Sequence, residues 1–159
     1  MVKVELRMNA LVVLVSYHNN NTRKIADVIS KALDAEMKTP KQIIPEELEG
    51  YDLIGFGSGI YSGKHHEDLI NLADKLPITN KKAFIFSTSG VYSPKFHSLL
   101  NEKLQAKGYT IIGEFSCKGF NTNSFLKLFG GMNKGRPNAE DLAQAEEFAV
   151  NLKHKMEKS

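Results

Sequence analysis

The amino-acid sequence predicts one doubly wound α/β domain, in which a five-stranded parallel sheet is covered by helices on both faces. The chain has 159 residues, which corresponds to about one domain with a single core. Short apolar, β-branched runs alternate along it with segments whose apolar residues recur at helical spacing. Strands that alternate with helices form parallel sheets with right-handed crossovers. With 42% apolar and 25% charged residues, the composition excludes disorder, collagen-like repeats and a coiled coil.

The first strand and the first helix have the clearest patterns. Residues 11–15 read Leu-Val-Val-Leu-Val, a continuous apolar run that suits a strand buried on both faces. We expect Thr22 to cap the helix that follows. The apolar face of this helix consists of Ile25, Ala26, Ile29 and Leu33.

The same alternation continues through the middle of the chain. Residues 36–39 are expected to form the second strand and residues 51–56 the third. The next helix opens on Glu67 and Asp68, whose charges favour the positive end of its dipole, and Pro77 ends it.

The second half of the chain supplies the two remaining strands, residues 83–86 and 109–117. Between them Ser93 caps a helix that has proline at its first position and ends before Gly108. Asn138 begins the last helix, and the acidic residue three positions later makes a partial capping box. We therefore expect one domain over residues 10–156 and an N-terminal extension over residues 1–9, with Met8 as an alternative start.

Composition and charge exclude several classes of function. The net charge of +3 comes from 21 cationic and 18 anionic residues, which is too even for a nucleic-acid-binding surface. No apolar run approaches the ~18 residues of a transmembrane segment, and no secretory signal is present, so we expect a cytoplasmic protein. The lone Cys117 forms no internal disulfide or metal cluster and reads as a small buried apolar residue. No metal site is expected.

The loops that follow the strands should hold the ligand, because open α/β sheets bind ligands beyond the carboxyl ends of their strands. Residues 16–22 place hydroxyl and amide side chains directly before a helix N-terminus, which favours an anion. The loop lacks the glycine–lysine pattern of a nucleoside triphosphate site. A phosphate monoester held by neutral donors fits it, and an ordinary polar turn is the alternative.

Two further loops, residues 57–64 and 88–92, each combine a glycine bend with a tyrosine. Glycine lets a backbone approach a flat ligand closely, so these loops suggest a planar ring held between them. A phosphate-accepting receiver domain is excluded, because Ser16 and Gly57 stand where its strands require aspartates.

With these residues the chain resembles the flavodoxin-like FMN-binding proteins over nearly its whole length. Their S-x-x-T-G-N-T segment corresponds to residues 16–22, with Asn19 in place of the first threonine and Asn20 in place of the glycine. The resemblance implies a three-layer fold with strand order 2-1-3-4-5. It also implies that FMN phosphate binds to Ser16, His18, Asn19, Asn20, Asn21 and Thr22. His18 lies near the phosphate or points to solvent.

By the same resemblance, the flavin ring lies between two sets of residues. These are Ser58, Gly59, Ile60 and Tyr61 after the third strand, and Thr88, Ser89, Gly90, Val91 and Tyr92 after the fourth. Tyr92, or else Tyr61, would stack on the ring. The peptide that rearranges beside the reduced flavin would be at Gly59 or at Gly63.

The implied function is a low-potential electron carrier between redox proteins, such as a ferredoxin or a reductase. Residues 57–66 are also similar to a segment of menaquinone-dependent protoporphyrinogen dehydrogenases. The alternative is therefore an FMN-dependent oxidoreductase acting on quinone, protoporphyrinogen or NAD(P)H, and a flavin-binding domain without turnover is a third reading. No side chain stands out as a catalytic acid or base.

The remaining polar residues receive simpler interpretations. Residues 118–136 carry four cations, no carboxylate and three phenylalanines, and they either cover the flavin and dock partners or pack on the core as a helical turn. His65 and His66 are expected at the surface, with a polar contact to the flavin or a substrate as the alternative. His97 and His154 are expected on solvated helix faces.

Overall fold

The computed structural model describes residues 8–17, 21–91, 93–118 and 137–158. Its central sheet contains five parallel strands in the order β2 (Glu36–Lys38), β1 (Ala10–Val15), β3 (Leu53–Tyr61), β5 (Lys82–Ser89) and β6 (Thr110–Lys118). This is the predicted order 2-1-3-4-5. A sixth short strand, β4 (Lys64–His65), was not predicted and pairs antiparallel with the end of β3.

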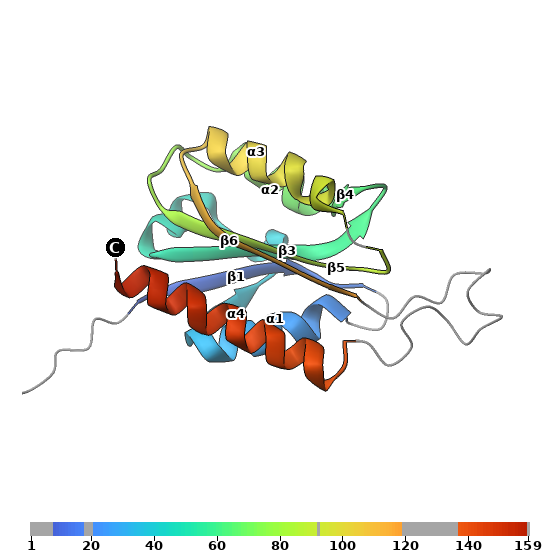
Figure 1. Cartoon of the computed structure of the whole chain (residues 1–159). Coiled ribbons are helices and arrows are strands. Elements are labelled where there is room, and N and C mark those ends of the chain that lie inside the picture. The colour runs from blue at the N-terminus through green and yellow to red at the C-terminus, as the bar shows by residue number, and fades with distance from the viewer. Residues whose placement is uncertain (1–7, 18–20, 92, 119–136, 159) are drawn as a thin grey trace, which may run out of the picture.

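Helices cover both faces of the sheet, as predicted (Figure 1). The helices α1 (Asn21–Leu33) and α4 (Ala139–Glu157) pack together on one face. The helices α2 (Glu67–Lys75) and α3 (Ser98–Ala106) pack together on the other. The four residues expected on the apolar face of the first helix are all buried there: Ile25, Ala26, Ile29 and Leu33.

The helix ends mostly follow the predicted signals. The side chains and backbone amides of Asn138 and Asp141 bond reciprocally at 2.9 and 2.8 Å, which completes the capping box of α4. Gly108 has a φ of +97° just after α3, the left-handed conformation in which glycine ends helices. In the described residues no helix is long and apolar enough to cross a membrane.

Two helix starts differ from the prediction. Thr22 is the second residue of α1 and not its cap, because its side chain is turned toward the sheet. The segment capped by Ser93 opens as a short 3-10 turn, η3 (Pro94–His97), before α3 begins. Two more 3-10 turns, η1 (Pro40–Gln42) and η2 (Pro45–Gly50), connect β2 to β3.

The strands β3 and β5 run further than their apolar residues indicated. Ser58 and Gly59 continue the parallel ladder opposite Ser87 and Thr88, so residues expected in loops belong to strands. Serine, threonine and glycine resemble loop residues in a sequence, but their backbone groups pair here as well as those of any other residue.

One of the predicted loop glycines has a packing role instead. A Cβ atom on Gly57 would lie 2.2 Å from the ring of Phe86, and one on Gly55 would lie 2.1 Å from Phe84. Both phenylalanines are fully buried on the face covered by α1 and α4. Gly57 therefore makes room for a core ring and not for a ligand.

Candidate functional site

Three predicted segments meet at the carboxyl edge of the sheet. They lie at the carboxyl ends of β1, β3 and β5, which are adjacent strands. The register places Val15 opposite Ser58, and Ser58 opposite Ser87. Consequently the segments that begin at Ser16, Ser58 and Thr88 lie side by side, as a ligand that spans them requires.

The first segment combines polar donors with a helix N-terminus. Asn21 and Thr22 are buried at the start of α1, and Ser16 is half-buried. The Ser16 hydroxyl accepts a hydrogen bond from the amide of Arg23 at 3.1 Å, which leaves its own hydrogen to donate. The first turn of α1 contains no acidic residue. His18, Asn19 and Asn20 lie outside the described residues, so their contact with a phosphate stays a prediction.

A buried hydrogen bond joins the first segment to the third. The hydroxyl oxygens of Thr22 and Thr88 are 2.8 Å apart. One hydroxyl donates to the other, so one hydrogen of the pair is directed elsewhere. The contact fixes the start of α1 against β5 and couples the expected phosphate segment to an expected ring segment.

The second segment ends in a tight hairpin. Ser62 and Gly63 both have positive φ, 52° and 78°, between the paired residues Tyr61 and Lys64. This backbone is typical of a two-residue hairpin turn. Gly63 lies in the turn, whereas Gly59 lies in the β-ladder opposite Thr88. Ile60 pairs with the following short strand.

An aromatic cluster closes one side of the second segment. The Tyr61 ring stands edge-on to the His66 ring, with their centroids 5.1 Å apart. The Tyr17 ring also contacts His66, with a centroid distance of 5.3 Å. Burial, and then proximity to Tyr17, raise the pKa of Tyr61. Tyr17 and His66 were missed as site residues. Their positions in the sequence could have indicated them, because Tyr17 directly follows a strand and His66 directly precedes a helix.

The backbone at the start of α2 explains the orientation of His66. Its Nδ1 accepts from the amide of Asp68 at 3.0 Å, so His66 is the N-cap of that helix. Its own amide donates to the Ser58 hydroxyl at 2.9 Å, and this hydroxyl donates to the carbonyl of Gly59 at 2.6 Å. Ser58 is fully buried. Its hydroxyl joins the start of α2 to the backbone of the second segment.

The third segment leaves β5 as an exposed bend. Ser89 donates to the carbonyl of Val91 at 2.7 Å, and the Val91 side chain is exposed beside Gly90. Tyr92 lies outside the described residues, so its stacking on a ring stays a prediction. Among the described residues of the three segments there is no carboxylate.

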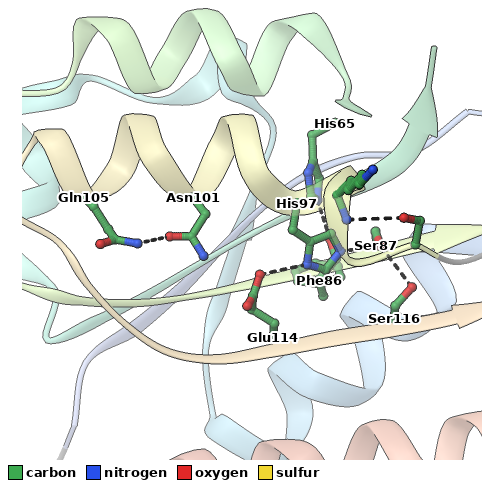
Figure 2. A network of polar contacts seen from close by, with 10 residues as sticks. His65, Phe86, Ser87, His97, Asn101, Gln105, Glu114 and Ser116 are labelled. Atoms are coloured by element: carbon green, nitrogen blue, oxygen red, sulfur yellow. Dashed lines mark hydrogen bonds and ion pairs between the residues drawn. The ribbon is translucent and has the colours of Figure 1, made fainter. Parts of the chain in front are cut away.

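A polar network with two buried histidines lies next to the second and third segments in the chain (Figure 2). It contains His65, Ser87, His97, Glu114 and Ser116, and sequence reasoning missed it. The expectation that His65 and His97 face solvent was wrong, since they are 1% and 2% exposed. The hairpin turns His65 inward, and η3 turns His97 toward the sheet.

Hydrogen bonds hold both histidines in place, and His65 Nδ1 is buried without a hydrogen-bond partner in the described residues. His65 Nε2 donates to the carbonyl of Phe86 at 2.9 Å. His97 lies 2.7 Å from the Ser87 hydroxyl through Nε2 and 3.1 Å from Glu114 through Nδ1. Burial lowers the pKa of His65 to about 4 and lowers that of His97, while Glu114 opposes the change at His97. As predicted, Cys117 is buried.

The donor set fits FMN. Hydroxyl, amide and backbone N–H groups at a helix N-terminus suit its phosphate, and the second and third segments offer small residues and backbone groups to a flat ring. The described residues of the three segments themselves carry no carboxylate that would repel an anionic ligand. Among the described residues Ser16, Asn21 and Thr22 would hold the phosphate, and the segments at the ends of β3 and β5 would hold the ring.

Comparisons with known proteins identify the family and the fold of this chain. A family model described as a flavodoxin domain matches residues 12–132. An uncharacterized protein of Methanocaldococcus jannaschii is 50% identical over 147 residues, covering 91% of this chain and 98% of that protein.

Two solved structures are similar in fold. Oxidised Flavodoxin 2 from Bacillus cereus has a TM-score of 0.70 and 20% identity, covering 92% of this chain and 99% of its own. A flavodoxin from the domain Archaea has a TM-score of 0.65 and 18% identity, covering 94% and 99%. At these identities the structural matches show a shared fold.

Proposed function

This chain belongs to the flavodoxin domain family, and we propose that it binds FMN and carries electrons between redox proteins at low potential. The observation that supports this best is the meeting of three neutral, donor-rich segments on adjacent strands at the carboxyl edge of the sheet. When bound, FMN supplies the electron-accepting ring, and the protein supplies binding, orientation and tuning of the potential.

The residues at the start of α1 bind and orient the phosphate. Asn21 and Thr22 are buried where the unpaired N–H groups of the helix begin, and Ser16 can donate its hydroxyl hydrogen. The segments after β3 and β5 hold the ring through backbone groups and exclude water from its faces, with Tyr61 on one side. Neutral donors offset little of the charge that reduction adds, which keeps the potential low.

The partner is a redox protein, such as a ferredoxin or a reductase, that approaches the same edge of the sheet. Lys64 of β4 and Lys95 of η3 are exposed on elements that pack together beside the ring segments. These two cations favour a partner whose contact surface is acidic. We place the protein in the cytoplasm.

The alternative is an FMN-dependent oxidoreductase that acts on quinone, protoporphyrinogen or NAD(P)H. It is favoured by the similarity of residues 57–66 to the dehydrogenase segment. Of the two histidines in that segment, His65 is buried and bonded to Phe86, whereas His66 is half-buried beside Tyr61. His66 is therefore the histidine that a substrate could reach.

The binding site is tested by the double variant Asn21→Ala/Thr22→Ala. We expect it to weaken FMN binding at least tenfold, about 1.4 kcal/mol, because it removes an amide and a hydroxyl at the phosphate end. FMN fluorescence quenching measures the affinity. The matched control is Thr110→Ala/Asn151→Ala, which removes the same groups at exposed positions on β6 and α4. Equal affinity in the two double variants would contradict the assignment of this segment.

A further inference from the structure

We propose that His97 is a redox-linked proton site: its imidazole takes up a proton when bound FMN is reduced and releases it on oxidation. The proposal rests on the proposed function, and it adds a role for the buried network of His65, Ser87, His97, Glu114 and Ser116 (Figure 2). The proposed binding of FMN does not by itself give the residues of this network a role.

Hydrogen bonds fix the tautomer of His97. The Glu114 carboxylate can only accept, so the hydrogen on the 3.1 Å contact belongs to His97 Nδ1. His97 Nε2 is then the acceptor of the Ser87 hydroxyl at 2.7 Å. The proton-binding atom is therefore Nε2, which faces the interior and not the solvent.

The network can take up the proton without losing a hydrogen bond. Once Nε2 carries a proton it donates to the Ser87 oxygen, and the Ser87 hydroxyl turns to donate to Ser116, 3.1 Å away. Ser116 is half-buried and Glu114 is exposed, so the network reaches from the interior to the surface. One proton from water is bound at Nε2 for one electron that a reductant delivers to the flavin.

The network lies next to both segments that are expected to hold the ring. Ser87 directly precedes Thr88 on β5, and His65 is paired with Ile60 across the hairpin. The rings of His65 and His97 lie 4.9 Å apart. Negative charge added to a ring held by these segments therefore acts on His97 through protein and not through bulk water.

The charges around the pair allow one proton and disfavour a second. Glu114 of β6 favours the charged form of His97, and a charged His97 in turn lowers the pKa of His65 on β4. The neutral Ser87 is the contact from β5. On the helices above, Lys103 and Lys107 of α3 are bonded to Asp74 of α2. Burial keeps His97 neutral at pH 7 in the absence of added negative charge.

Linkage requires the effect to be reciprocal. If reduction raises the pKa of His97, then protonation of His97 raises the reduction potential by the same coupling free energy. The potential should consequently fall as pH rises through the interval between the two pKa values. Outside that interval His97 contributes no pH dependence.

The test is an NMR titration of histidine-labelled protein with FMN bound, first oxidised and then reduced with dithionite. Binding is established beforehand by quenching of FMN fluorescence. We expect the His97 pKa to rise by about half a unit or more on reduction, because added negative charge on the neighbouring segments favours the charged imidazole. The exposed His154 on α4 is the control in the same spectra and should not shift.

Two variants complete the design. His97→Asn identifies the resonance, and Glu114→Gln, at an exposed position, should lower the His97 pKa in both redox states. An unchanged His97 pKa in protein that binds and reduces FMN overturns this inference and leaves the proposed function standing. Failure to bind FMN overturns both.

Discussion

The packing of Gly57 leads to a quantitative prediction. A methyl group at this position would lie 2.2 Å from the Phe86 ring, whereas carbon atoms in contact are ~3.5–4.0 Å apart. The ring would have to retreat by more than ~1 Å in a core where Phe86 is fully buried and stacked on Phe84. Overpacking of this kind costs ~1–3 kcal/mol. Gly57→Ala should therefore lower Tm by about 2–12 °C.

Gly59→Ala is the matched control, two residues along the same strand face. A methyl group there would meet the Tyr61 ring at 3.4 Å, an ordinary contact. We expect its stability to stay within ~0.5 kcal/mol of the parent. Thermal unfolding of both variants, followed by circular dichroism, separates a glycine that makes room for a core ring from one that does not. A Tm for Gly57→Ala equal to that of Gly59→Ala would refute the packing argument.

Two further predictions concern stability. His65 is buried in its neutral form, with a pKa of about 4 in the folded protein against 6.5 in the unfolded chain. Between these values the unfolded chain binds more protons, so acid destabilises the fold. The free energy of unfolding in urea should therefore be ~2 kcal/mol lower at pH 5 than at pH 7, and the difference should be smaller in His65→Gln. A pH-independent midpoint in the parent would contradict this. Asn138→Ala removes the capping box of α4 and should cost ~1 kcal/mol. The control is Asn151→Ala at an exposed position of the same helix, where alanine should stabilise by no more than ~0.7 kcal/mol.

The order of the elements and their buried faces were predictable because apolar residues recur along this sequence at the spacing of strands and helices. The run at residues 11–15 could only be a strand inside the sheet, and every one of its residues is buried. The apolar face of α1 follows from its spacing in the same way. Capping residues such as Asn138 act on backbone groups within a few positions, so local sequence determines them.

The errors concern contacts between distant residues. Ser58, Gly59, Thr88 and Ser89 looked like loop residues, and only pairing across strands makes them part of β3 and β5. The positions of histidines in a sequence do not indicate whether their side chains are buried. His97 is buried because Glu114, 17 positions away, and Ser87, ten positions away, supply its partners from two different strands.

The candidate site was predicted in outline for a related reason. Loops after adjacent parallel strands must meet, so the three segments could be named before their geometry was known. The Thr22–Thr88 hydrogen bond and the Tyr17–His66–Tyr61 cluster depend on how the segments face each other. Sequence spacing contains no information on that orientation.

The central claim, that the chain is an FMN-dependent electron carrier, is tested most directly by anaerobic reductive titration of the FMN-loaded protein, followed by visible absorbance. The account predicts reduction in two separate one-electron steps, and no direct reaction with NADH, NADPH or a menaquinone analogue. Bleaching in a single two-electron step by a nicotinamide, or rapid reoxidation by the quinone, would contradict the carrier and favour the oxidoreductase.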